Sequence, residues 1–221
     1  MKKVQGRLEP VVNGLSVRQF LGVPYAEPPV GQLRFAHPKP AKKWDGIRDA
    51  VEFGPECPQA SMEDMAKEMN ITGDGDEVRK VPQSEDCLSL NVYTPSHATA
   101  QDKLAVMVWI HGGGFIFGSA RSYNPSVLVA LHDVIVVSIN YRLGVLGFFN
   151  IPGTDVKGNY AMFDQIDALG DGMKMFLPNK FSDLEVGLSK YVMRLLTQFA
   201  KYGVIKLDSG YEILGHLRRE G

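Results

Sequence analysis

The sequence has almost no net charge, because 24 lysines and arginines balance 25 aspartates and glutamates. A balanced chain produces no field that would attract nucleic acid or an acidic membrane surface. No apolar run approaches the roughly 18 residues of a membrane span. Met1, Lys2 and Lys3 open the sequence with positive charge, but no apolar segment follows them, so no cleavable signal peptide is predicted.

Recognisable metal-binding patterns are also missing. Asp74-Gly75-Asp76 is acidic, but the ligand spacing of an EF-hand does not follow it, and a solvated acidic loop is the simpler interpretation. His37, His97 and His132 occupy turn or helix-end contexts, which are typical of solvated surface histidines. We therefore expect no metal and no cofactor.

Cysteine is scarce, with only Cys57 and Cys87 in the chain. They enclose 29 residues, and a bridge between them would stabilise the fold by about 3–4 kcal/mol in the chain-entropy description. Two unpaired thiols are the alternative, and the spacing alone does not decide between them. Asn70-Ile71-Thr72, between the cysteines, is the only N-x-[ST] triplet and makes Asn70 a glycosylation candidate.

The most informative feature that is present is the run His111-Gly112-Gly113-Gly114-Phe115, directly after the apolar residues 106–110. Such a glycine run lets a ligand approach the backbone amides. In acyl-transfer enzymes a loop of this kind donates N–H groups to the oxyanion, beside a nucleophile that is usually the Ser of G-x-S-x-G. No G-x-S-x-G occurs in the 221 residues. The sequence therefore predicts half of an esterase active site.

Hydrophobic patterning predicts an α/β fold. Leu88–Tyr93 alternates like a half-buried strand, whereas Leu104–Ile110 and Val134–Ile139 are continuous apolar runs typical of strands covered on both faces. Pro125–His132 suits a short helix that begins with proline. This strand–helix–strand order favours a mostly parallel sheet.

The pattern changes after residue 169. Ser182-Asp183-Leu184-Glu185 is a capping box, and apolar residues at helical spacing follow it, so a helix is predicted over Ser182–Tyr202. Val204–Leu207 is a short strand candidate, and a polar tail follows it to the last residue.

Four segments together resemble the type-B carboxylesterase/cholinesterase family, which also contains the non-catalytic neuroligins. The resemblance covers about residues 5–169 and implies an incomplete α/β-hydrolase fold, with the N-terminal part of the central sheet and a late C-terminal helix. The segments are residues 20–31 (FLGVPYAEPPVG), 84–93 (SEDCLSLNVY), 107–115 (MVWIHGGGF) and 140–149 (NYRLGVLGFF), the last leading to Gly158-Asn159-Tyr160 and Asp164-Gln165.

The resemblance assigns roles to residues that patterning alone leaves open. Gly113 and Gly114 correspond to two oxyanion-hole donors, and His111 to a part of the loop rather than a catalytic base. The family closes a loop at the positions that match Cys57 and Cys87, which favours the bridge. Four charged residues correspond to two buried ion pairs of the family, Arg34 with Glu85 and Arg142 with Asp164.

The sequence departs from the family after the segment that ends at Leu169. The nucleophile elbow is missing, and Leu169 occupies the place of the catalytic histidine, because Gly170-Asp171-Gly172 resembles the segment that follows that histidine. His216 lies near the end of the chain, but a base is of no use without a positioned nucleophile. We expect residues 1–169 to form the N-terminal part of the domain, residues 170–221 to be a C-terminal remnant of it, and this chain to be inactive.

Two functional hypotheses follow. The first is a carboxylic ester hydrolase lineage acting on small-molecule esters, and the second is a non-catalytic adhesion or binding module of the neuroligin kind. An intact G-x-S-x-G in a full-length transcript would favour the enzyme. The family is typically secreted or held in the endoplasmic-reticulum lumen; the sequence predicts neither the oligomeric state nor the ester.

Overall fold

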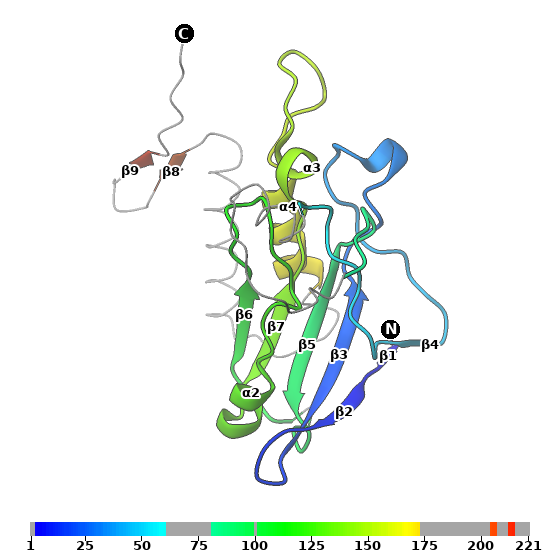
Figure 1. Cartoon of the computed structure of the whole chain (residues 1–221), viewed down its shortest axis with the longest axis vertical. Helices are drawn as coiled ribbons and strands as arrows, with labels where there is room; N and C mark the ends of the chain where they lie inside the picture. Colours follow the sequence, from blue (N-terminus) through cyan, green and yellow to red (C-terminus); the bar gives the residue numbers. More distant parts are fainter. Residues whose placement is uncertain (1–2, 61–80, 100, 173–203, 207–211, 215–221) are drawn as a thin grey trace, which may run out of the picture.

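The structure is a computed structural model that describes residues 3–60, 81–99, 101–172, 204–206 and 212–214. Its centre is a five-stranded sheet in the order β2-β3-β5-β7-β6 (Figure 1). The β2–β3, β3–β5 and β5–β7 pairs are antiparallel, and β6–β7 is parallel. The strands are β2 (Arg7–Pro10), β3 (Ser16–Pro24), β5 (Ser89–Pro95), β6 (Val106–Ile110) and β7 (Ile135–Ile139).

The predicted strand–helix–strand unit is present as β6, α2 (Ser126–His132) and β7. The sheet of the described residues is mixed: β6 and β7, the strands of the unit that favours a parallel sheet, pair in parallel, and the other three pairs are antiparallel. Parallel neighbours need a crossover connection, usually helical. In the described residues such a crossover, helix α2, joins β6 to β7, and these two strands are parallel.

Helix α2 has local signals at both ends. The Asn124 side chain accepts a hydrogen bond from the N–H of Ser126, and Pro125 O accepts one from the N–H of Val129. The helix ends where Asp133 adopts a left-handed conformation, with φ of 50°. Val129 is fully buried in a cluster with residues of β3, β5 and β7, so α2 packs on the sheet that it connects.

Burial in the sheet differs from the sequence expectation at two strands. β5 was predicted to be half-buried, but six of its seven residues are buried. Its polar Asn91 is accommodated because it accepts a hydrogen bond from Gly22 N and donates one to the Ser138 hydroxyl. β6 was predicted to be covered on both faces, yet Met107 is 49% and Trp109 41% exposed. In the described sheet β5 is central, whereas β6 stands last in the order and has a strand neighbour on one side only.

Helix α4 (Tyr160–Asp167) carries a buried face that includes Asp164 and Gln165 and continues into a π-helical turn, η2 (Ala168–Gly172). Leu169, in that turn, packs against the larger of the two core clusters. The predicted helix over 182–202 lies outside the described residues.

No helix in the described ranges has the length and apolar character needed to cross a membrane. The remaining elements are β1 (Lys3–Gln5) paired with β4 (Ile47–Asp49), η1 (Gly31–Leu33), α3 (Gly144–Phe148), and β8 (Val204–Lys206) paired with β9 (Glu212–Leu214).

Candidate active site

The glycine loop, residues 111–118, begins where β6 ends. Gly113 O accepts hydrogen bonds from Ile116 N at 3.0 Å and Phe117 N at 3.2 Å, which curl the loop into a tight turn. Gly113 has φ of +112°, and a Cβ there would lie 1.9 Å from Phe117 O. Only glycine fits this position, because any side chain would collide with the backbone.

The next position differs in its surroundings. Gly114 also has positive φ, +61°, but no atom of the described residues lies within 4 Å of where its Cβ would be. Among the described residues, no hydrogen bond uses the N–H of Gly113 or of Gly114. The loop therefore has two adjacent backbone N–H groups that no hydrogen bond among the described residues uses.

Tyr141 holds the start of the glycine loop. Its hydroxyl donates to His111 O at 2.6 Å, and its ring stacks on the His111 ring with centroids 4.2 Å apart. His111 Nδ1 lies 2.9 Å from Gly112 O, and burial lowers the pKa of the imidazole. His111 is thus buried and stacked at the start of the loop, where its Nδ1 contacts the backbone of the next residue.

Gly118, at the end of the glycine loop, and the two residues that follow it are hydrogen-bonded to three side chains from other segments. Gln59 forms two hydrogen bonds with Gly118: its Nε2 donates to Gly118 O at 3.0 Å, and its Oε1 accepts from Gly118 N at 2.8 Å. The Ser119 hydroxyl donates to Glu56 Oε1 at 2.8 Å. The Ala120 N–H donates to the Asn140 side chain at 2.8 Å. The backbone donors of the loop are therefore held on a rigid frame.

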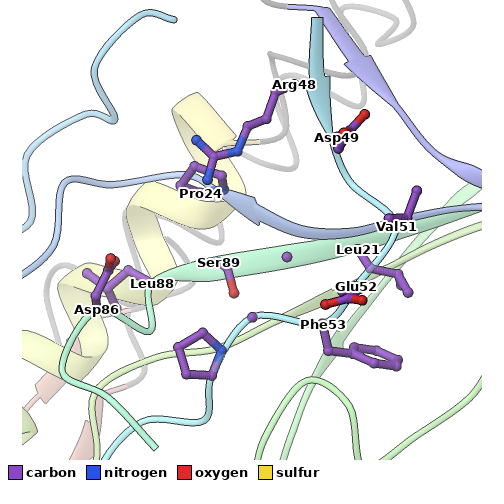
Figure 2. Close-up of a pocket in the computed structure, with 13 residues that line it drawn as sticks. Leu21, Pro24, Arg48, Asp49, Val51, Glu52, Phe53, Asp86, Leu88 and Ser89 are labelled. Atoms are coloured by element: carbon purple, nitrogen blue, oxygen red, sulfur yellow. The ribbon is translucent and has the colours of Figure 1, made fainter. Parts of the chain in front are cut away.

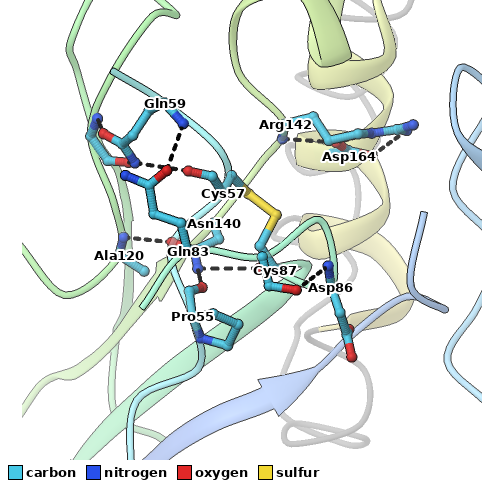
Figure 3. The surroundings of a disulfide bond; sticks show 12 residues. Pro55, Cys57, Gln59, Gln83, Asp86, Cys87, Ala120, Asn140, Arg142 and Asp164 are labelled. Atoms are coloured by element: carbon cyan, nitrogen blue, oxygen red, sulfur yellow. Dashed lines mark hydrogen bonds and ion pairs between the residues drawn. A yellow bond between two sulfur atoms is a disulfide. The ribbon is translucent and has the colours of Figure 1, made fainter. Parts of the chain in front are cut away.

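That frame includes a disulfide between Cys57 and Cys87, both of which are buried (Figure 3). The Asn140 side chain donates to Cys87 O and to Pro55 O, each at 3.1 Å. Gln59, which binds Gly118, also donates to Cys57 O. The disulfide thus lies in the same bonded network as the glycine loop.

The two expected ion pairs are both present but differ in burial. The Arg142 guanidinium donates one hydrogen bond to each carboxylate oxygen of Asp164, both at 2.8 Å. The Arg142 side chain is 3% exposed and the Asp164 side chain 0%. Burial raises the pKa of the Asp164 carboxyl, and its pairing with Arg142 counters that rise. Arg34 bonds Glu85 at 2.6 Å, but its side chain is 46% exposed. The expectation of burial is therefore wrong for this pair, because Arg34 directly follows the surface turn η1.

The other candidate residues lie apart from the glycine loop. His97 pairs with Asp133 at 3.1 Å on the surface, and His37 stacks on Phe163 at 3.8 Å. The glycosylation candidate Asn70 and His216 lie outside the described residues. Within the described ranges, no cluster of three or more His, Cys, Asp or Glu side chains could hold a metal ion.

The residues that build this loop and its frame match a known family over most of the chain. The model of the carboxylesterase family matches residues 2–170. The chain belongs to the carboxylesterase family. Its fold is accordingly that of an α/β-hydrolase, of which the mixed sheet and its helices are a part.

Individual carboxylesterase relatives match the same region. The medium-chain fatty acyl-CoA hydrolase precursor of Anas platyrhynchos is 47% identical over 154 residues, which cover 70% of this chain and 28% of that protein. The cocaine esterase of Oryctolagus cuniculus is 47% identical over 155 residues, 69% of this chain and 28% of that protein. The acylcarnitine hydrolase of Mus musculus is 44% identical over 168 residues, which cover 76% of this chain and 30% of that protein. The match thus spans about three tenths of these carboxylesterases.

Three residues of the frame were not predicted as functional. Asn140 and Tyr141 belong to a segment that carries the family resemblance, so a signal was present, but the pattern gave them no individual role. Gln59 follows Cys57 by two residues in a segment without periodicity. Its two bonds to Gly118 depend on tertiary contact across 59 residues of chain, which no local pattern reports.

Removing the disulfide of this carboxylesterase-family chain should destabilise it strongly. The bridge has a sequence separation of 30 residues, so replacing Cys57 and Cys87 by alanine should lower the free energy of unfolding by about 3–4 kcal/mol. Urea unfolding of the oxidised chain and of the double variant measures the difference. A non-reduced digest in which mass spectrometry finds both cysteines as free thiols would contradict the basis of this prediction.

Proposed function

We propose that this chain is the N-terminal part of a serine carboxylic ester hydrolase, in which Gly113 and Gly114 donate the oxyanion hydrogen bonds. The observation that carries the proposal is the pair of adjacent glycine N–H groups, which no hydrogen bond among the described residues uses. The Cβ position of Gly114 faces open space within the described chain. The names of the relatives, among them an acyl-CoA hydrolase and a cocaine esterase, support an enzyme lineage over an adhesion module.

The chemistry of such an enzyme explains the geometry. When a serine hydroxyl attacks an ester carbonyl, the carbonyl oxygen becomes an anion, and preorganised N–H donors stabilise that charge. The frame around His111 and Gly118 keeps the donors in place before the reaction begins. Carboxylic esters are the substrate class of the complete enzyme.

We infer that the 221 residues do not perform this reaction alone. They contain no G-x-S-x-G, and Leu169, at the position the resemblance gives to the catalytic histidine, is apolar and packs on the core. In this proposal residues 1–169 are the N-terminal part of the domain and residues 170–221 are its C-terminal remnant. The end of the family match at residue 170 supports that boundary.

A turnover assay tests the proposal. The purified chain should hydrolyse p-nitrophenyl butyrate no faster than buffer. A chimera in which residues 2–170 replace the matched segment of the Anas platyrhynchos hydrolase should hydrolyse it, and a serine-directed organophosphate should block that activity. Organophosphate-sensitive turnover by the chain alone would refute the inactivity, and a folded but inactive chimera would refute the proposed oxyanion role.

A further inference from the structure

A cavity of about 350 Å³ opens beside β3, β4 and β5 (Figure 2). Its volume falls within the range of small-molecule sites, about 300–1,000 Å³. Pro24, Val51 and Phe53 give it apolar walls, and none of the residues that line it belongs to the glycine loop. The cavity is therefore lined by residues other than those of the glycine loop.

The charges on this cavity are predominantly negative. Asp49, Glu52 and Asp86 line it together with one cation, Arg48, whose guanidinium lies 5.5 Å over the Trp44 ring. In the part of the chain that the structure describes, none of the three carboxylates forms an ion pair. Three carboxylates and one guanidinium therefore line the cavity, so a positively charged guest would meet net attraction there.

A buried hydroxyl provides a second, independent indication of a ligand. Ser89 is nine-tenths buried, and its hydroxyl projects from β5 towards the loop that carries Glu52 and Phe53 (Figure 2). No hydrogen bond among the described residues uses this hydroxyl. Gly54 lies against it, and a Cβ at Gly54 would come within 2.7 Å of Ser89 Oγ. Ser89 Oγ differs from the unpartnered Tyr93 hydroxyl, which is completely buried, because Ser89 Oγ keeps access to solvent. A donor on a guest molecule can therefore reach it.

We propose that this cavity binds a small organic cation, a primary or secondary ammonium attached to a short apolar body. The ammonium donates a hydrogen bond to Ser89 Oγ in the field of the carboxylates, and the apolar body lies against Val51 and Phe53. The carboxylates do not converge on a point, since no metal-holding cluster occurs in the described ranges. An organic cation can be attracted by separated carboxylates, whereas a metal ion needs several oxygen ligands at one point.

Calorimetric titration of the full chain with 2-phenylethylammonium tests the proposal. We expect saturable binding at one site that weakens as sodium chloride is raised. The uncharged analogue 2-phenylethanol, which has the same apolar body, should bind at least about tenfold more weakly. Equal binding of the two probes, or no binding of the ammonium, would overturn the proposal.

Variants locate the site. Ser89→Ala and Glu52→Gln should each weaken ammonium binding about three- to tenfold. Asp155→Asn, which removes an exposed carboxylate outside the cavity lining, should leave it unchanged. Glu52 is exposed, so its variant keeps the test decisive even if Ser89→Ala perturbs folding. A Glu52→Gln chain that binds as tightly as the parent, or an equal loss in Asp155→Asn, would place the probe elsewhere and overturn the proposal.

Discussion

In the active chimera, Gly114→Ala should lower kcat about 100- to 1,000-fold, the effect of removing one oxyanion donor. Gly114 has φ of +61°, a conformation that costs alanine about 1–2 kcal/mol. Relieving that strain turns the peptide plane and moves the N–H away from the oxyanion. Because no atom of the described chain lies within 4 Å of the new Cβ, the loss reflects the backbone rather than a collision. KM should change little, since the oxyanion forms only during reaction.

The matched control for this prediction is Gly14→Ala. Gly14 also has positive φ, +73°, with nothing within 4 Å of its Cβ position, but it lies in the turn between β2 and β3. The control therefore introduces the same kind of strain far along the chain from the glycine loop and should change kcat less than about twofold. If both variants lost activity equally, or if Gly114→Ala stayed fully active, Gly114 would not be an oxyanion donor. Gly113→Ala is less informative, because its Cβ would collide with Phe117 O.

Arg142→Ala should lower the free energy of unfolding of the chain by about 3–5 kcal/mol, because it leaves the carboxylate of Asp164 buried and unpaired. Both side chains are almost completely buried, and Asp164 also accepts a bond from the Arg142 backbone N–H at 3.0 Å. Urea unfolding measures the loss. The double variant Arg142→Met with Asp164→Leu should recover much of it, since both charges are then gone.

The exposed ion pair is the control for the buried one. Arg34→Ala removes a pair with the same bidentate geometry at 2.6 Å, but water can solvate the Glu85 carboxylate that remains. The loss of stability should therefore be far smaller than for Arg142→Ala. Losses of similar size in the two variants would mean that burial does not determine the contribution of these pairs.

The parts of the fold that depend on local chain signals could be predicted from the sequence. β6, α2 and β7 form where the apolar runs and Pro125 indicate, and the glycine loop follows β6 as expected. The cysteine pairing came from the family resemblance, because 29 intervening residues permit either a bridge or two thiols. Local patterning and the resemblance thus locate the site along the chain.

Burial and long-range contacts could not be predicted in the same way. The polar positions of β5 suggested an exposed face, yet Asn91 is buried because it bonds Gly22 and Ser138, which lie on neighbouring strands. The opposite error occurred at β6, where apolar character was taken for burial. In both strands the deciding factor is position in the sheet order, and the residues of a single strand do not encode that order.

The three consecutive residues Asn140, Tyr141 and Arg142 each hold a different part of the molecule: the disulfide region, the start of the glycine loop, and helix α4. Inserting or deleting one residue just before them would shift all three side chains by one place and exchange their directions. Three separate segments would then lose their attachments in a single genetic event. Point substitutions here should reduce stability by amounts that depend on the side chain replaced, whereas a change of chain length should prevent folding. Natural insertions and deletions in this family should therefore avoid the junction between β7 and α3.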